Sequence, residues 1–210
     1  MTLPELLNAY RFPKEPPAVP AVDHGWLSPE VEEMLSCILC EHMGVVVELG
    51  SWLGKSTRFI ADHAPTAVVI AVDHWKGSRE HHLMTDVRAF LPVLYETFLR
   101  SCWEYRDRIV PLRMNTVDGL TTIDDYGVQP HVIYIDASHE YQEVLADIEL
   151  SLMLFPNALL CGDDWRWEGV RRAVTEVTKA GRMMARTKLN VWWRESSAFE
   201  KNLPGSEVVA

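Results

Sequence analysis

The chain of 210 residues has a formal net charge of −10, and 48% of its residues are hydrophobic against 24% charged. This balance predicts a globular domain with one sizeable core, and the negative charge, which would repel a phosphate backbone, excludes nucleic acid as an expected partner. No apolar run approaches the length of a membrane span and the N-terminus lacks a signal pattern, so we expect no membrane partner and a cytoplasmic location.

Residues 1–43 are expected to form an N-terminal extension. The first part, 1–27, is rich in proline and predicts an extended arm or a lid. The segment SPEVEEMLSCILCEHMG that follows has the pattern of an amphipathic helix, with Ser28 as N-cap, Pro29 in the first turn and Gly44 as C-cap.

Cys37 and Cys40 form a C-x-x-C pair within this helical segment. The remaining cysteines, Cys102 and Cys161, supply no second pair that would complete a zinc site. We therefore interpret the pair as buried thiols on a core-facing helix rather than as metal ligands or redox groups.

Strand and helix patterns alternate through residues 44–195, which are expected to form the main domain, with a tail at 196–210. Short runs rich in valine and isoleucine predict parallel strands buried on both faces, at 45–49, 68–72, 109–112, 132–136 and 157–161. Helical patterns lie near 55–64, 83–105, 117–123, 140–153 and 167–180. The segment RMMARTKLNVWWRE predicts two more strands, antiparallel to each other at one edge. The pattern indicates an α/β fold with a doubly wound sheet that binds ligands at the carboxyl ends of its strands.

The stretch VVVELGSWLGKS joins the first of these strands to a helix through a loop with two glycines. A dinucleotide fingerprint needs a glycine where this loop has Trp52, which disfavours an NAD-type oxidoreductase, and the Walker phosphate-loop pattern fails by one residue. The spacing of Glu48, Gly50 and Gly54 instead suits a ligand with an amino-acid tail and an adenosine. The next strand ends in Asp73, a carboxylate that can accept both hydroxyls of a ribose.

On these motifs the chain resembles the class I S-adenosylmethionine-dependent methyltransferases over about residues 44–195. VELGSWLGKST looks like their first motif and VIAVDHW like their ribose-binding motif. The longer stretch VIYIDASHEYQEVLADIELSLMLFPNALLCGDDW is similar to metal-dependent small-molecule O-methyltransferases, such as catechol O-methyltransferase and macrocin O-methyltransferase. The resemblance implies a Rossmann-like, mostly parallel sheet of seven strands with one antiparallel edge strand. It also implies S-adenosylmethionine as cofactor, bound by Glu48, Gly50, Ser51, Trp52, Gly54, Ser56, Asp73, His74, Asn115 and Asp136.

Acidic residues follow two neighbouring strands of the expected sheet. Asp136 ends one strand, and Asp163 and Asp164 follow the next. Because the tips of adjacent strands lie about 4.8 Å apart, these carboxylates could share one Mg²⁺ or Mn²⁺. The resemblance places metal ligands at the same positions. The alternative is that Asp163 and Asp164 cap the helix that begins near Trp167.

His139 follows Asp136 by three residues, where the metal-dependent relatives carry a lysine or histidine as catalytic base. The alternative is a surface or capping histidine. Trp165 and Trp167 could form an aromatic wall for a substrate or simply pack. The sequence EHH at 80–82 has no spaced partner for a metal and is expected to be a solvated loop.

These features favour a metal-assisted O-methyltransferase that acts on a hydroxyl of a small molecule. The metal would lower the pKa of the hydroxyl, and His139 would take its proton. An alternative is a non-catalytic or regulatory protein that binds S-adenosylmethionine on the same fold. The acceptor stays open between a sugar, a catechol-like ring and a natural-product scaffold. The oligomeric state is also open, although proline-rich arms of this kind often pack across a dimer.

Overall fold

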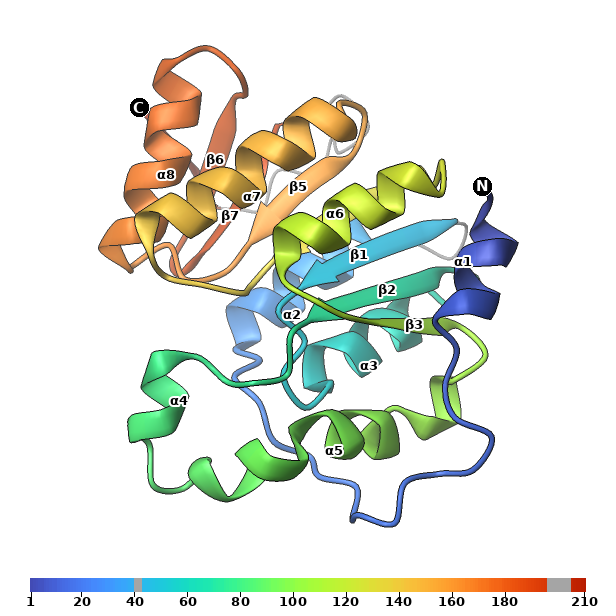
Figure 1. Ribbon diagram of the computed structural model, residues 1–210. Helices are drawn as coiled ribbons and strands as arrows, with labels where there is room; N and C mark the ends of the chain where they lie inside the picture. Colours follow the sequence, from blue (N-terminus) through green and yellow to red (C-terminus); the bar gives the residue numbers. More distant parts are fainter. Residues whose placement is uncertain (40–42, 196–204) are drawn as a thin grey trace.

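A mixed sheet with the strand order β3-β2-β1-β4-β5-β7-β6-β8 runs through the molecule (Figure 1). The computed structural model describes residues 1–39, 43–195 and 205–210. The strands are β1 Val45–Leu49, β2 Val68–Asp73, β3 Ile109–Arg113, β4 Val132–Ile135, β5 Leu159–Gly162, β6 Ala185–Lys188, β7 Val191–Arg194 and β8 Glu207–Val208. The α-helices are α1 Leu3–Ala9, α2 Pro29–Ile38, α3 Lys55–His63, α4 Arg79–Leu83, α5 Leu94–Ser101, α6 Thr116–Asp125, α7 Tyr141–Leu154 and α8 Glu168–Lys179, and the 3₁₀ helices are η1 Arg88–Val93 and η2 Trp103–Tyr105.

The doubly wound α/β fold expected from the sequence is confirmed. Strands β1 to β5 are parallel neighbours, and β7 pairs antiparallel with both β5 and β6. The sheet has eight strands rather than seven, because the short strand β8 adds to the edge antiparallel to β6. A strand of two residues has no alternating pattern that a sequence could display, so this edge was not foreseen.

The two faces of the sheet carry separate hydrophobic clusters, as the alternation of side chains along a strand requires. Val45, Val47 and Leu49 of β1 belong to one cluster, which is covered by α1, α6, α7 and α8 (Figure 1). Val46 belongs to the other, which is covered by α2, α3 and α5. The near-continuous burial of these strands on both faces explains why their sequences contain almost no polar residues.

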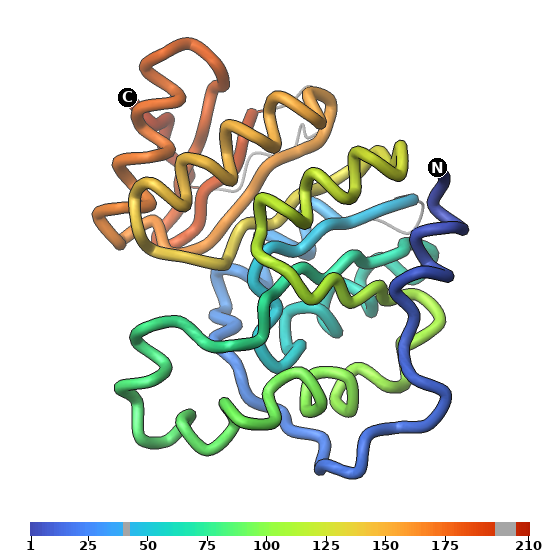
Figure 2. Tube along the Cα trace, viewed as in Figure 1, coloured from blue at the N-terminus to red at the C-terminus, as the bar shows by residue number. Residues whose placement is uncertain are grey.

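The N-terminal extension is more structured than an extended arm. Its first residues form the helix α1, whose Leu6 is fully buried. The chain then passes along α5 before it reaches α2 (Figure 2), and the Oγ atom of Ser101 hydrogen-bonds with both the N–H and the carbonyl of Val22. The long helix expected at 83–105 is broken into η1, α5 and η2, and Pro92 lies inside η1.

The helix expected at 28–44 begins as predicted and ends early. Val31 N–H donates to Oγ of Ser28, which caps α2, but the helix stops at Ile38. Gly44 is not its C-cap: it leads into β1, where a Cβ atom would lie 2.9 Å from the ring of His131. Cys37 is half-buried with a free thiol, and Cys40 lies outside the described residues. Within the described ranges, no helix combines the length and the apolar character needed to cross a membrane.

Candidate active site

The sequence-predicted residues come together because the strands that carry them are in register. Leu49 of β1 is paired with Val72 of β2 and with Ile135 of β4, and Ile135 is paired with Gly162 of β5. The residues that follow these positions therefore leave the sheet at the same edge. They are Gly50, Asp73, Asp136 and Asp163.

Glycine is required at two positions of the loop after β1. Gly50 has φ +90°, and a Cβ there would lie 2.1 Å from the carbonyl oxygen of Asp136. Gly54 has φ +83° at the start of α3, and a Cβ there would lie 2.3 Å from Sγ of Cys102. The loop thus packs directly against the end of β4 and against α5.

Trp52 keeps a left-handed backbone, with φ +47°, at the position where a dinucleotide fingerprint has glycine. This conformation costs a non-glycine residue roughly 1–2 kcal/mol. Asp73 offsets the cost, because its Oδ2 accepts the N–H groups of Ser51 at 3.2 Å and Trp52 at 3.0 Å. Its Oδ1 accepts the N–H of Trp75 at 2.6 Å, and Nε1 of Trp75 donates to the carbonyl of Trp52 at 2.8 Å. The carboxylate at the end of β2 therefore also holds the glycine loop in place.

Glu48 is fully buried beneath this loop. Burial raises its pKa, although the hydrogen bond from Thr57 favours the ionised form. Thr57 donates to its Oε2, whereas Oε1 of Glu48 and Oγ of Ser51 are buried with no hydrogen-bond partner in the described part of the chain.

His74 and Asn115 lie at the ends of β2 and β3, and their side chains bind their own loops. Nδ1 of His74 accepts the N–H of Lys76 at 2.9 Å. Asn115 is the N-cap of α6, where it accepts the N–H of Asp118 at 2.8 Å and donates to its carboxylate at 2.7 Å.

Burial and neighbouring charges disfavour the ionised forms of Asp136 and Asp163 at the ends of β4 and β5. Burial, followed by the charges of Asp163 and Asp164, raises the pKa of Asp136 well above its usual range, although Tyr134 donates to its Oδ2 at 3.0 Å. Burial also raises the pKa of Asp163 to about 6, with a further contribution from the charge of Asp164. Oδ1 of Asp163 accepts from the N–H of Asp164 at 2.7 Å and from Asn190 at 2.8 Å.

The carboxylate of Asp164 is directed to His139. Its Oδ2 lies 2.7 Å from Nε2 of His139, and its Oδ1 accepts from Asn190 at 3.3 Å. No side chain caps α8, so the capping role considered for Asp163 and Asp164 is not seen. Among the described residues, no group of three or more His, Cys, Asp or Glu side chains is arranged to hold a metal ion.

His139 is fixed on three sides. Its ring stacks on Trp167 with centroids 4.2 Å apart and an interplanar angle of 15°. Its Nδ1 is buried without a hydrogen-bond partner among the described residues and lies 3.9 Å from Oε1 of Glu80. Burial lowers the pKa of His139, but the hydrogen bond to Asp164 and the charges of Asp164, Glu80 and Asp163 outweigh burial and raise it overall.

The expectation of a loop at 80–82 is wrong, although Glu80 and His82 are exposed to solvent as expected. These residues lie in α4, where Ser78 forms a capping box with His81. The ring of His81 lies 5.3 Å from Trp26 of the N-terminal extension and 4.2 Å from Trp52, measured between centroids. Glu80 approaches His139 from the same helix. The serine before a short helix was a usable signal for α4, but nothing local indicated its aromatic partners.

Asn190, in the turn between β6 and β7, is the other residue that sequence reasoning missed. The local sequence shows an asparagine between two strand patterns, which indicates a turn but does not reveal which residues its side chain contacts.

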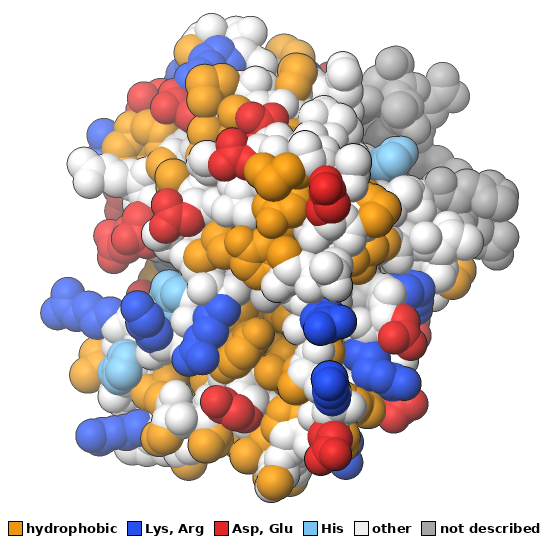
Figure 3. Space-filling view, turned by 45° about the vertical axis from the view of Figure 1, so that its right-hand side comes forward, with side chains coloured by type: hydrophobic (Ala, Val, Ile, Leu, Met, Phe, Trp, Pro, Cys, Tyr) orange, Lys and Arg blue, Asp and Glu red, His pale blue; other side chains and the backbone are white. Residues whose placement is uncertain are grey.

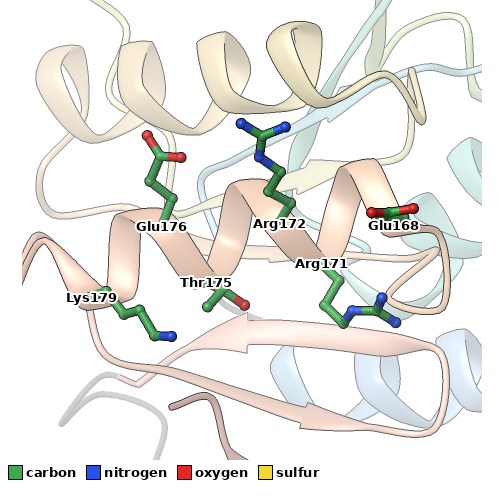
Figure 4. A pocket seen from close by; sticks show the side chains of 6 residues that line it. All are labelled: Glu168, Arg171, Arg172, Thr175, Glu176 and Lys179. Atoms are coloured by element: carbon green, nitrogen blue, oxygen red, sulfur yellow. The ribbon is translucent and has the colours of Figure 1, made fainter.

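A shallow hollow follows the outer face of α8 (Figure 4), lined by Glu168, Arg171, Arg172, Thr175, Glu176 and Lys179. Two of these side chains already contact α7, since Arg172 lies over the ring of Tyr141 and Glu176 accepts its hydroxyl. On the face in Figure 3, hydrophobic, acidic and basic side chains are interspersed.

Comparison with protein families gives one match. A family model described as a methyltransferase domain matches residues 47–165, which contain the glycine loop, Asp73, Asp136, His139 and the paired acids. No curated protein sequence gives a significant match.

Solved structures of methyltransferases share the fold. The chain is similar to an O-methyltransferase from Bacillus cereus in complex with SAH, with a TM-score of 0.55, 20% identity and coverage of 80% of this chain and 82% of that one. It is also similar to the calicheamicin methyltransferase CalS11, with a TM-score of 0.55, 12% identity and 81% coverage of each chain. A precorrin 8w decarboxylase from Methanobacterium thermoautotrophicum matches with a TM-score of 0.57, 15% identity and coverage of 87% and 95%. At these identities the likeness shows the fold and leaves the reaction to be inferred from the site.

Proposed function

Because the chain belongs to the methyltransferase-domain family, we propose that it is an S-adenosylmethionine-dependent O-methyltransferase that acts on a hydroxyl of a small molecule with the help of a divalent cation. The observation that carries the proposal is the pairing of His139 with Asp164 at the same sheet edge as the glycine loop and Asp73. A protein that only binds the cofactor has no need of a half-buried imidazole anchored by a carboxylate. This pair therefore favours an enzyme over the regulatory alternative.

The residues around the glycine loop fit S-adenosylmethionine. Oε1 of Glu48 and Oγ of Ser51 are buried and have no partner among the described residues, so a polar ligand group would remove the cost of leaving them unpaired. The carboxylate of Asp73 would accept the ribose hydroxyls. Gly50 has no Cβ atom, so the loop can lie directly against Asp136. When bound, the cofactor supplies an electrophilic methyl group on a sulfonium.

His139 would act as the general base. Its Nε2 is held by Asp164, which leaves Nδ1 as the ring nitrogen free to accept the proton of an acceptor hydroxyl. The Asp164 carboxylate would stabilise the imidazolium that forms, and the stacked ring of Trp167 would keep the imidazole in its plane.

Asp136 and Asp163 fit the chemistry of a hard divalent cation. Both are carboxylates whose pKa is raised by burial and by the charges of neighbouring acids, and a cation between them would favour their ionised forms. When bound, the cation would lower the pKa of the acceptor hydroxyl. Asp164 is less suited to be a third ligand than the sequence indicated, because its oxygens already contact His139 and Asn190.

Two measurements test this proposal. Calorimetry with S-adenosylhomocysteine should show binding to the purified protein, and no binding would remove the cofactor from the proposal. Labelled S-adenosylmethionine should then transfer its methyl group to a member of a panel of glycosides, catechols and related hydroxylated compounds. The Bacillus cereus and CalS11 relatives motivate the choice of a hydroxyl acceptor. A protein that binds the homocysteine product yet methylates nothing in the panel, with or without Mg²⁺, would favour the regulatory alternative.

A further inference from the structure

Asn190 binds the loop that carries the paired acids. Its side-chain amide donates to Oδ1 of Asp163 at 2.8 Å and to Oδ1 of Asp164 at 3.3 Å, and its side-chain oxygen accepts the N–H of Arg166 at 3.1 Å. Its backbone carbonyl accepts the N–H of Trp165 at 2.8 Å. A residue of the β6–β7 turn thus contacts consecutive residues of the loop after β5.

These contacts decide where the carboxylate of Asp164 points. Asp164 has φ +62°, a left-handed conformation that needs support from its surroundings. With Oδ1 facing the Asn190 amide and Oδ2 facing Nε2 of His139, rotation of the carboxylate is restrained at both oxygens. The amide suits this place because it offers donors to two carboxylates and an acceptor to a backbone N–H. An aspartate there would set a third carboxylate against the other two.

We propose that Asn190 is a positioning residue for His139, acting through Asp164. Asp164 accepts the Nε2–H of His139, and Nδ1 is thereby assigned as the atom that takes the proton of the acceptor. The designation of His139 as base rests on the proposed function. The hydrogen bonds that link Asn190 to Asp164 and Asp164 to His139 are independent of the proposed function. Asn190 also lies outside the residues 47–165 that the family model matches.

The test uses the full-length protein labelled with ¹⁵N-histidine and needs neither acceptor nor metal. A hydrogen-bonded Nε2–H of His139 should give a downfield proton signal that exchanges slowly with water, assigned as the signal lost in His139→Gln. In Asn190→Ala the signal should move upfield and broaden. In Asn190→Asp the signal should be changed at least as strongly, because the amide that donates to Asp163 is replaced by a carboxylate oxygen, which only accepts.

Leu189→Gly is the matched control. Leu189 is the neighbouring turn residue, 53% exposed with φ +55°, so glycine relieves strain and leaves the Asn190 contacts intact. Its signal should match that of the wild type. Affinity for S-adenosylhomocysteine should be unchanged in all of these variants, because the glycine loop and Asp73 are untouched. With a known acceptor, Asn190→Ala should lower kcat roughly 10–100-fold with little change in KM, an effect typical of residues that orient a functional side chain.

An unchanged downfield signal in Asn190→Ala and Asn190→Asp would overturn the proposal, and so would a wild-type spectrum without a signal that His139→Gln removes. If Asn190→Ala does not fold, the nearly isosteric Asn190→Asp decides. A wild-type protein that fails to bind S-adenosylhomocysteine contradicts the proposed function alone, since the signal still reports on the Asn190–Asp164–His139 contacts.

Discussion

Nε2 of His139 and Oδ2 of Asp164 lie 2.7 Å apart, although 25 positions separate them in the chain. His139 follows β4 and Asp164 follows β5, and because these strands are parallel neighbours, their following loops meet. A carboxylate at this distance orients the imidazole and favours its protonated form. The pair therefore gives the first prediction.

Protonation of His139 should depend on Asp164. Burial lowers the pKa of His139, but the hydrogen bond to Asp164 and nearby carboxylates raise it overall, so the titration midpoint should lie above the usual 6.5. The stabilisation from the pair is then complete below about pH 6.5 and is lost as pH rises through the folded-state pKa. Asp164→Asn should lower the midpoint, measured by NMR of the His139 Cε1 proton. Identical midpoints in the two proteins would contradict the assigned cause.

Removal of Asp73 should weaken cofactor binding. Hydrogen bonds to a charged acceptor contribute roughly 1.5–3 kcal/mol each, so Asp73→Ala should raise the Kd for S-adenosylhomocysteine by at least about 10-fold in calorimetry. The loss includes the support that Asp73 gives to the N–H groups of Ser51 and Trp52. Glu149→Ala removes an exposed acid on α7 that pairs with Arg182 and should leave the Kd unchanged. An unaltered Kd in Asp73→Ala would place the ribose elsewhere.

Divalent cations should bind at the ends of β4 and β5. Mn²⁺ or Mg²⁺ should raise the thermal unfolding temperature, because a ligand that binds only the folded state stabilises it. Asp136→Asn and Asp163→Asn should abolish the shift, and methyl transfer to an identified acceptor should stop in EDTA and return with Mg²⁺. Full activity in EDTA, with no shift in the unfolding temperature, would contradict a role for the cation. Proton transfer to His139 and the positioning of the acceptor beside the cofactor would then have to account for catalysis.

Gly50→Ala should cost far more than substitution of another glycine with a left-handed backbone. At Gly50 the new Cβ would lie 2.1 Å from the carbonyl of Asp136, whereas at Gly181, with φ +70°, it would meet nothing within 4 Å. Gly181→Ala should therefore cost only about 1 kcal/mol for its backbone conformation, and Gly50→Ala about 3 kcal/mol or more, with loss of S-adenosylhomocysteine binding. Urea unfolding of both variants checks this, and equal losses would mean that the contact with Asp136 is not restrictive.

Asp147→Asn should stabilise the protein at alkaline pH. Asp147 is 1% exposed on α7, and burial raises its pKa to about 7 in spite of a hydrogen bond from Thr116. The unfolded carboxyl ionises above about pH 3.9, so the folded state loses stability between that pH and about 7. The asparagine variant should gain up to about 4 kcal/mol at pH 8 and much less at pH 4, measured by urea unfolding. A gain that is the same at both pH values would point to packing rather than ionisation.

The sequence by itself determined the parallel core of the sheet. Strands buried on both faces must be apolar along their length, so β1 to β5 appear as short runs of valine, isoleucine and leucine. The acid at the end of β2 and the glycines after β1 could also be identified, because a ligand at strand ends requires those residue types within a few positions.

The tertiary structure alone decided which side chains meet. The sequence placed Asp164 at a strand end beside other acids, and only the folded chain shows that its carboxylate hydrogen-bonds with His139 and that Asn190 reaches it from a distant turn. His81 resembled a loop residue and lies against Trp26 and Trp52. Sequence patterns report the average environment of a segment, through its periodicity and its turn residues. The direction of one carboxylate depends on left-handed backbone angles and on partners many positions away, and these exist only after β5, β6 and β7 have paired.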